Sequence, residues 1–245
     1  MNYGLVVAAG AGTRFGGRKQ FALLKGKPIL YYSLRAFECC PAVKEVVLVT
    51  NADMIDRTEV MTKRWRFGKT KWIVAGGEQR QDSVAQGLRV LPDRGMVAIH
   101  DGVRPFLTPE QIARGFRECR RRKAVIFGVP ISETVKSVRF EASPKSKIQN
   151  PKSKIQRAGV VMRTIPREHL ILAQTPQFYD LTVIKRAYDQ ARQDGYYATD
   201  DAQLVERLRL GVAVLDGWPE NVKVTTRADL EVAGRLPHSA LRTTL

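Results

Sequence analysis

Apolar runs of strand length alternate with helix-length amphipathic patterns over the first half of the chain. The strand-like runs are YGLVVAA (3–9), KEVVLVT (44–50), KWIVAGG (71–77), GMVAIHD (95–101) and AVIFGVP (124–130). The helical pattern before the last of these runs begins with Thr108, Pro109 and Gln111, a spacing that predicts a capping box. Strands separated by helices predict a mostly parallel, twisted α/β sheet that is flanked by helices.

The alternation breaks between residues 131 and 165, where two short strand-like patterns enclose a tandem copy of PKSKIQ. We interpret 131–165 as a β-arm for dimerisation, with a mobile repeat tip at 143–157. The rest of the chain predicts no linker, so residues 1–245 form a single domain. Ordered patterns return after the arm, including a helix capped by Thr199 and a strand-like run at 221–226.

Length and composition limit the class of protein. The chain has 245 residues, of which 44% are hydrophobic, and can bury a substantial core. It shows neither an apolar run of the roughly 20 residues needed for a membrane span nor a signal segment, so we expect a cytoplasmic protein without a membrane partner. The three cysteines have no C-x-x-C spacing, which favours structural thiols over a zinc site.

The net charge of +17 raises a second possibility, a protein that binds nucleic acid or another polyanion. The cations concentrate in residues 57–72, 114–123 and 142–157. Two of these stretches have apolar residues at helical core spacing, and none interleaves aromatic side chains as a single-strand platform does. We therefore interpret the charge as solvated surface and expect no nucleic acid partner. Sequence-independent binding that survives about 0.2 M salt would favour the alternative.

Three polar clusters follow predicted strands, at residues 10–19, 76–83 and 100–104. In an open parallel sheet, ligands bind outside the carboxyl ends of the strands. Because each cluster follows a strand end, we expect all three to lie at one edge of the sheet. The sequence therefore predicts one ligand site built from segments that are far apart along the chain.

The first cluster, within LVVAAGAGTRFGGRKQ (5–20), has the form of a phosphate-binding turn. It lacks the G-x-x-x-x-G-K-[ST] spacing of a Walker A loop. The dinucleotide fingerprint requires a glycine where Phe15 stands, which disfavours a dinucleotide-dependent oxidoreductase. Arg14 and Lys19 indicate a triphosphate whose oxygens gain charge during reaction. The structural alternative is a tight turn whose cations lie on the surface. We interpret Arg18 as such a surface cation.

The other two clusters supply a carboxylate and a glycine pair. Asp101, at a strand end beside a phosphate site, predicts a divalent cation, most simply Mg²⁺, unless it is only a turn residue. Gly77 and Ser83 predict close approach to a flat base, although helix capping also explains Ser83. Arg104 is either a second anion contact or a structural arginine, and we assign His100 no role.

Taken in order, the motifs resemble one enzyme family. They are A-A-G-x-G-x-R (8–14), K-Q (19–20), G-G-x-x-R-x-x-S-V (76–84), H-D-x-x-R-P (100–105), T-P-Q (175–177), T-D (199–200) and N-x-K-x-T (221–225). The set is similar to the 2-C-methyl-D-erythritol 4-phosphate cytidylyltransferases of the non-mevalonate isoprenoid pathway. This resemblance implies a Rossmann-like fold of the nucleotide-diphospho-sugar transferase type, a homodimer formed through the β-arm, and Mg²⁺ or another divalent cation.

The resemblance also implies a reaction and its residues. CTP and the polyol phosphate would give a CDP-alcohol and pyrophosphate, by in-line attack on the α-phosphorus. The catalytic residues would be Arg14, Lys19, Arg167 and Lys223. CTP would contact Ala8, Ala9, Gly10, Gly12, Gly77, Ser83 and Asp101, and Asp101 would also hold the metal. The polyol phosphate would contact Arg104, Thr134, Thr175 and Thr199. A cytidylyltransferase for another polyol phosphate, such as ribitol 5-phosphate, is the alternative.

Overall fold

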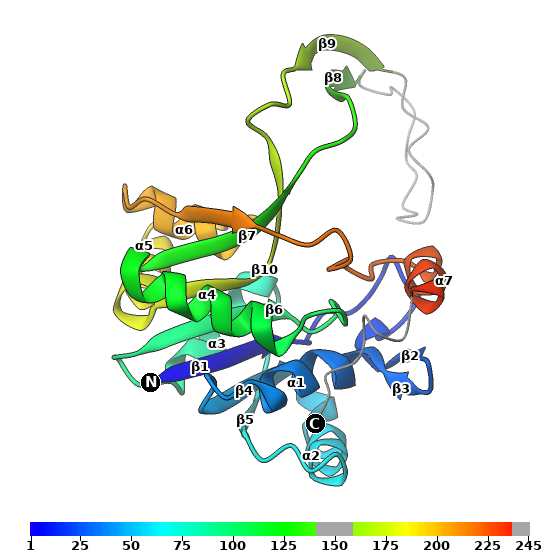
Figure 1. Ribbon diagram of the computed structural model, residues 1–245, viewed down its shortest axis with the longest axis vertical. Helices are drawn as coiled ribbons and strands as arrows, with labels where there is room; N and C mark the ends of the chain where they lie inside the picture. The colour runs from blue at the N-terminus through cyan, green and yellow to red at the C-terminus, as the bar shows by residue number, and fades with distance from the viewer. Residues whose placement is uncertain (141–158, 237–245) are drawn as a thin grey trace.

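The computed structural model of the chain describes residues 1–140 and 159–236. A seven-stranded sheet forms its centre, with strand order β11-β7-β10-β6-β1-β4-β5 (Figure 1). These strands are β1 (Asn2–Val7), β4 (Glu45–Thr50), β5 (Thr70–Ala75), β6 (Met96–Asp101), β7 (Ala124–Pro130), β10 (Ile171–Asp180) and β11 (Ala213–Asp216). Neighbouring strands are parallel except at β10, which runs antiparallel to both β6 and β7. The predicted mostly parallel α/β sheet is confirmed.

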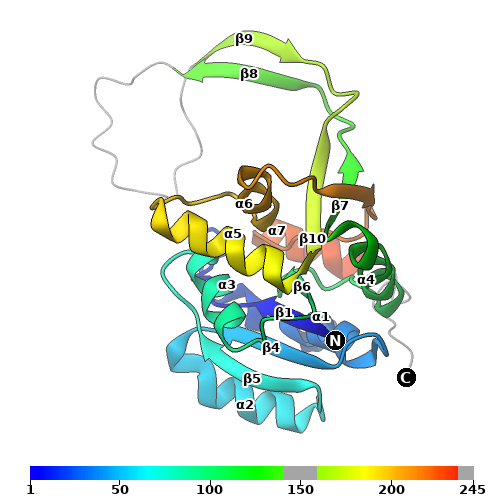
Figure 2. The ribbon, with the colours of Figure 1, turned by 90° about the vertical axis from the view of Figure 1, so that its left-hand side faces the viewer.

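Helices cover both faces of this sheet (Figure 2). On one face lie α1 (Ile29–Cys39) and α4 (Pro109–Arg122), and on the other lie α3 (Arg80–Arg89), α5 (Leu181–Gln193) and α6 (Asp201–Arg207). The strands serve both cores because successive side chains point to opposite faces. In β1, for example, Val6 packs with α1 and α4, whereas Leu5 packs with α3 and α5. The remaining long helix, α2 (Ile55–Arg64), packs against edge strand β5.

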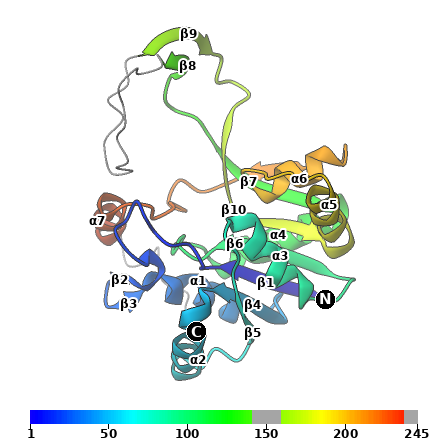
Figure 3. The ribbon, with the colours of Figure 1, turned by 180° about the vertical axis from the view of Figure 1, so that it is seen from behind.

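A third, smaller core supports the segment that follows β1. Its buried side chains include residues of α1, of β2 (Leu23–Leu24) and of α7 (Arg227–Arg235), and β2 pairs with β3 (Lys27–Pro28). The segment after β1 extends toward α7 in Figure 3, and Phe15 packs into this core. Two short 3₁₀ turns, η1 (Lys19–Phe21) and η2 (Ala52–Met54), complete this part of the fold. The glycine-rich turn therefore lies between β1 and the third core, into which its Phe15 packs.

The predicted β-arm is an antiparallel hairpin of β8 (Val135–Phe140) and β9 (Gly159–Ile165). It projects from β7 and β10, away from the sheet (Figure 1). Several of its apolar side chains are exposed: Val138, Phe140, Val160, Val161 and Met162. The predicted mobile tip at 143–157 lies outside the described residues.

Local expectations are partly confirmed. The capping box of α4 forms, with Thr108 Oγ1 accepting from the Gln111 N–H. The cap of α6 is Asp200 rather than the expected Thr199, because the Asp200 carboxylate accepts the Gln203 N–H. Thr199 Oγ1 instead donates to the side chain of Gln203. The run 221–226 forms no strand, since its buried Val224 packs into the third core. Among the described helices, none is long and apolar enough to cross a membrane.

Candidate active site

The three polar clusters meet in one cavity of about 350 Å³ at the carboxyl ends of β1, β4 and β6. Its lining comprises Val7, Ala8, Ala9, Gly10, Ala11, Lys19, Gln20, Asn51, Gly77, Glu78, Gln79, Arg80, Ser83, Asp101, Val103 and Lys223. The expectation that the three clusters share one edge of the sheet is thus confirmed.

The two glycines of the first turn have different surroundings. Gly12 has φ +68°, and an added Cβ would lie 1.9 Å from the Gly17 carbonyl oxygen. Its own carbonyl accepts the N–H groups of Phe15 and Gly16. Gly12 is therefore needed for the turn itself. At Gly10 an added Cβ meets no protein atom within 4 Å, so the space beside this backbone is open to a ligand.

Two amide side chains, of Gln20 and Asn51, hold the backbone of the first segment, which we define as the residues from Ala8 to Lys19 after β1. Gln20 is fully buried, and its Nε2 donates to the Ala8 carbonyl at 2.7 Å and to Asn51 Oδ1 at 3.2 Å. Asn51 Nδ2 in turn donates to the Ala9 carbonyl at 2.7 Å. These bonds fix the direction in which the Ala8 and Ala9 peptides present their remaining polar groups.

The second segment, residues 76–83, contains the start of α3 and lines the cavity. Gln79 and Asp82 form a capping box. Ser83 Oγ accepts the Gly77 N–H and donates to the Gln79 carbonyl, both at 3.1 Å. A Cβ at Gly76 would lie 2.3 Å from Ala9 Cβ, so the first and second segments are in direct contact and only glycine fits between them.

Positive charge gathers where the first segment faces the C-terminal part of the chain. Burial lowers the pKa of Lys19, and the nearby charges of Lys223 and Arg14 lower it further. Lys223 Nζ lies 2.6 Å from Asp101 Oδ2. Arg14 is exposed at the turn, whereas Arg18 forms an ion pair with Asp53. The predicted surface role of Arg18 is confirmed.

Asp101 is the buried carboxylate of the site. Burial alone would raise its pKa, but the charges of Arg80, Lys223 and Arg104 hold the pKa below its usual range. Arg80 Nε lies 3.0 Å from Oδ1, opposite the contact of Lys223 with Oδ2. The carboxylate is therefore ionised and held from two sides.

The backbone around Asp101 is held by a second network. The Asp101 N–H donates to Thr175 Oγ1 at 3.0 Å, and that hydroxyl lies 3.2 Å from His100 Nδ1. His100 Nε2 lies 3.2 Å from the Arg104 carbonyl. Burial lowers the pKa of His100 to about 3, so the ring is neutral. In this state one ring nitrogen accepts the Thr175 hydroxyl and the other donates to Arg104.

Several predicted residues lie outside the described cavity lining. Arg104 and Thr175 are linked to each other through Asn221. The Asn221 carbonyl accepts from Arg104 Nη1, and Asn221 Nδ2 donates to the Thr175 carbonyl. Thr199 is exposed at the start of α6. Thr134 and Arg167 are exposed and lie at the root of the arm, Thr134 directly before β8 and Arg167 two residues after β9.

Sequence reasoning assigned no role to four residues that shape the site: Gln20, Asn51, Arg80 and Asn221. Asn51 follows β4 directly, so the strand-end argument that located the other clusters would also have located it. Arg80 stands in the second cluster, but nothing in its local sequence indicates its carboxylate partners. Gln20 and Asn221 act on backbone groups that are distant in the sequence.

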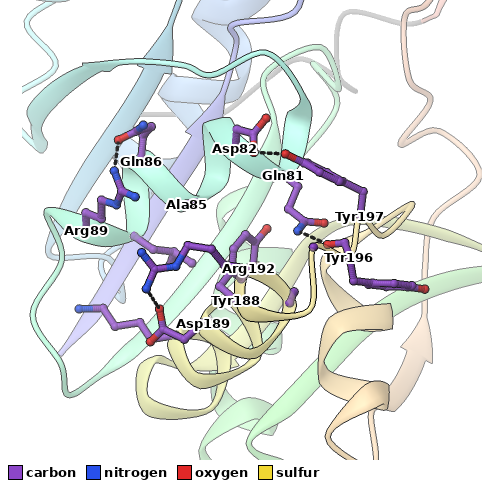
Figure 4. A pocket seen from close by; sticks show the side chains of 14 residues that line it. Gln81, Asp82, Ala85, Gln86, Arg89, Tyr188, Asp189, Arg192, Tyr196 and Tyr197 are labelled. Atoms are coloured by element: carbon purple, nitrogen blue, oxygen red, sulfur yellow. Dashed lines mark hydrogen bonds and ion pairs between the residues drawn. The ribbon is translucent and has the colours of Figure 1, made fainter.

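A second cavity, of about 300 Å³, lies between α3 and α5 (Figure 4). It shares α3 with the candidate active site, because Gln81 and Asp82 belong to the first turn of that helix. Tyr196 and Tyr197 close it from the segment before α6, and Tyr197 Oη donates to Asp82 Oδ1 at 3.1 Å. Tyr188 of α5 also lines this cavity.

The described residues contain no group of three or more His, Cys, Asp or Glu that would hold a metal ion unaided.

The sequence model of one family, IspD: 2-C-methyl-D-erythritol 4-phosphate cytidylyltransferase, matches residues 3–236. This chain belongs to the IspD family. A family member from Dehalococcoides mccartyi is 40% identical over 230 residues, covering 94% of this chain and 92% of the relative. Another, from Solibacter usitatus, is 38% identical over 253 residues, covering 98% of each chain.

Solved IspD structures share the fold. The 4-diphosphocytidyl-2C-methyl-D-erythritol synthase of Anaerococcus prevotii matches with a TM-score of 0.77 at 26% identity, covering 96% of each chain. The 2-C-methyl-D-erythritol 4-phosphate cytidylyltransferase of Thermus thermophilus matches with a TM-score of 0.72 at 26% identity, covering 94% of this chain and 96% of that structure. The family resemblance drawn from the ordered motifs is confirmed.

Proposed function

We propose that this IspD chain transfers the cytidylyl group of CTP to 2-C-methyl-D-erythritol 4-phosphate. The products are 4-diphosphocytidyl-2-C-methyl-D-erythritol and pyrophosphate. The observation that carries this proposal is the cavity at the sheet edge. There the glycine-rich turn meets three cations, Lys19, Arg80 and Lys223, and the buried carboxylate of Asp101. The names of the relatives, all 2-C-methyl-D-erythritol 4-phosphate cytidylyltransferases, supply the substrate.

The cytosine would lie between the first and second segments. Backbone groups at Ala8, Ala9 and Gly77 border this space, and Ser83 fixes the Gly77 peptide. Backbone donors and acceptors held by buried side chains suit base recognition, because they cannot rotate to accept a different base. Gly10 and Gly12 would then bring the backbone close to the phosphates.

The reaction is an in-line displacement at the α-phosphorus. A phosphate oxygen of the polyol substrate forms a bond to this phosphorus as the bond to the β-phosphate oxygen breaks, and pyrophosphate leaves. Negative charge grows on the phosphoryl oxygens during this step, and fixed cations stabilise it. Lys19 and Arg14 would act at the α-phosphate. Lys223 would position the phosphates from the opposite side.

The residues fit a divalent cation. Asp101 provides one ionised carboxylate next to the cations of the phosphate site, and Mg²⁺ is commonly bound through one or two carboxylates together with substrate phosphates and water. Asp101 would hold the cation, whose chemistry would be to neutralise phosphate charge. Because Arg80 and Lys223 engage one oxygen each, every carboxylate oxygen keeps acceptor capacity.

The polyol phosphate would bind on the side of Arg104, Thr175 and Thr199. We propose further that the single domain of residues 1–245 dimerises through the 131–165 arm, which would cover the exposed apolar side chains of β8 and β9. Arg167, at the root of the arm, would then reach the substrate in the site of the second subunit, and Thr134 would contact the polyol phosphate.

A pyrophosphate-release assay tests the proposal. CTP and Mg²⁺ are supplied with a panel of polyol phosphates that includes 2-C-methyl-D-erythritol 4-phosphate and ribitol 5-phosphate. We expect the highest kcat/KM with the methylerythritol substrate. Release only with ribitol 5-phosphate would favour the related cytidylyltransferase, and release with neither would overturn the assignment.

A further inference from the structure

The Arg80 guanidinium lies between two buried carboxylates. Its Nε donates to Asp101 Oδ1 at 3.0 Å, while Nη1 and Nη2 donate to the two oxygens of Asp201 at 3.1 and 2.8 Å. The Asp101 side chain is 9% exposed and that of Asp201 is 1% exposed. All three nitrogens of the guanidinium are therefore engaged, and Arg80 connects the reaction centre to the first residue of α6.

Asp201 has a further partner on α5. The Tyr188 hydroxyl donates to Asp201 Oδ1 at 2.5 Å. Burial and the neighbouring Asp201 carboxylate raise the pKa of Tyr188 well above its usual range, so its hydroxyl stays protonated and remains a donor. In Figure 4, Tyr188 lies on α5, facing α3. The network therefore runs from α5, through α6 and the start of α3, to the end of β6.

The geometry of this network does more than neutralise charge. The two parallel bonds to Asp201 fix the plane of the guanidinium, and a fixed plane fixes the direction of the Nε–H bond toward Asp101. Buried ion pairs of this kind contribute little net stability, because desolvation offsets their attraction. Stability alone is thus a poor explanation for placing two carboxylates, an arginine and a tyrosine in one buried chain.

The two contacts on the Asp101 carboxylate differ in character. Lys223 has a side chain that is 37% exposed and reaches the carboxylate with a single ammonium group. A lysine that turns toward the phosphates of a bound nucleotide loosens its contact with Asp101. Arg80 has no such freedom while Asp201 holds it. Arg80 is therefore the contact that keeps Asp101 oriented while substrates are bound.

We propose that Arg80 is a positioning residue for cytidylyl transfer, and that Asp201 and Tyr188 hold its guanidinium so that Asp101 keeps its reactive orientation. This inference rests on the proposed function. It assigns Tyr188 of α5 and Asp201 of α6 a role in the chemical step. Tyr188 is the member of the network farthest from Asp101, so its substitution should have the smallest effect.

The test compares kcat and KM for CTP in Tyr188→Phe, Asp201→Asn, Arg80→Lys and Arg80→Ala. We expect kcat to fall several-fold in Tyr188→Phe and about 10- to 100-fold in Asp201→Asn, with KM for CTP changed less than about threefold. Arg80→Lys should be nearly as slow as Arg80→Ala, because an ammonium group cannot bridge both carboxylates. In the double variant Arg80→Ala/Asp201→Asn, kcat should be no lower than in Arg80→Ala alone.

Tyr3→Phe is the matched control, since Tyr3 is also a buried tyrosine but its hydroxyl donates to Met1 Sδ, outside the Arg80 network. Thermal unfolding of each variant measures how much of it is folded. The inference is overturned if wild-type kcat survives in Arg80→Lys, if losses only follow the unfolded fraction, or if KM rises while kcat is unchanged. A wild-type chain that makes no product overturns the proposed function, and this inference with it. An active wild type with unaffected variants overturns the inference alone.

Discussion

Lys19 is half-buried and lies near two other cations, Lys223 and Arg14. Burial first, and then Lys223 and Arg14, lower its pKa. Such a cluster repels itself in the free protein, and a triphosphate relieves the repulsion on binding. Charge that develops during the reaction is stabilised further.

This arrangement predicts the kinetics of Lys19→Ala and Arg14→Ala. Each substitution should lower kcat by about 100-fold and raise KM for CTP much less, because the lost interaction is strongest in the transition state. Steady-state kinetics of pyrophosphate release measures both constants. Arg18→Ala is the control, since Arg18 belongs to the same turn but pairs with Asp53. A large rise in KM with unchanged kcat would contradict a transition-state role.

His100 makes the stability of the fold depend on pH. Its pKa is about 3 in the folded chain and about 6.5 when unfolded, so between these values the unfolded chain binds more protons. The free energy of unfolding should therefore fall as the pH is lowered from 6.5 toward 3, by up to about 1.4 kcal/mol per pH unit from this residue. Urea unfolding of the wild type and His100→Gln at pH 6.5 and pH 4.5 measures it.

In His100→Gln this contribution to the slope should disappear. The exposed His169, changed to Gln, is the control and should leave the slope as it is. Equal slopes in wild type and His100→Gln would contradict a neutral, buried His100.

At the scale of elements, the start of α3 serves both folding and binding. Asp82 Oδ2 accepts the Gln79 N–H at 3.0 Å, which closes the turn that presents Gly77 and Ser83 to the cavity. Asp82→Ala should lower the free energy of unfolding by about 1 kcal/mol and raise KM for CTP several-fold. Chemical unfolding and steady-state kinetics measure the two effects.

Asp180→Ala is the matched control for this prediction. Asp180 caps α5 by accepting the Thr182 N–H at 3.0 Å, and it stands at the end of β10 that pairs with Met96, away from the cavity. Its loss should lower stability by a similar amount and leave KM unchanged. Were both variants to raise KM equally, the effect would come from general loosening of the fold.

The elements also show what a sequence determines locally. The strands and the shared edge of the site were predictable, because the side-chain period and the strand-end rule depend only on local pattern and topology. The cap of α6 was not, because Thr199 and Asp200 are adjacent and both suit the position. The run 221–226 alternates like a strand, but Val224 packs against α7 and β2 instead of joining the sheet. Arg80 was missed as a structural link because Asp201 lies far along the chain.

In the whole molecule, the arm carries two of the proposed substrate contacts outside the cavity lining. Thr134 and Arg167 are exposed where the hairpin leaves the sheet, and the described cavity lining includes neither. A dimer joined through the arm would bring Arg167 of one subunit to the cavity of the other. In that arrangement each active site combines Lys19 of one chain with Arg167 of its partner.

Mixing two inactive variants tests this arrangement. Lys19→Ala and Arg167→Ala should each be nearly inactive alone. When they are unfolded and refolded together, mixed dimers contain one site with both residues intact, and activity should return to about a quarter of the wild-type value. Sedimentation velocity confirms that dimers form. If activity does not return although mixed dimers are present, Arg167 acts within its own subunit or has no catalytic role.

An isotope-labelled substrate shows directly which bond forms at the α-phosphorus of CTP. The chain is incubated with CTP, Mg²⁺ and 2-C-methyl-D-erythritol 4-phosphate whose phosphate oxygens carry a heavy isotope, and products are identified by phosphorus NMR and mass spectrometry. Attack by the substrate phosphate predicts equal amounts of pyrophosphate and 4-diphosphocytidyl-2-C-methyl-D-erythritol, with the label retained in the bridging oxygen of its diphosphate. Formation of CDP and inorganic phosphate, or of no labelled nucleotide, would rule out attack by the substrate phosphate on CTP.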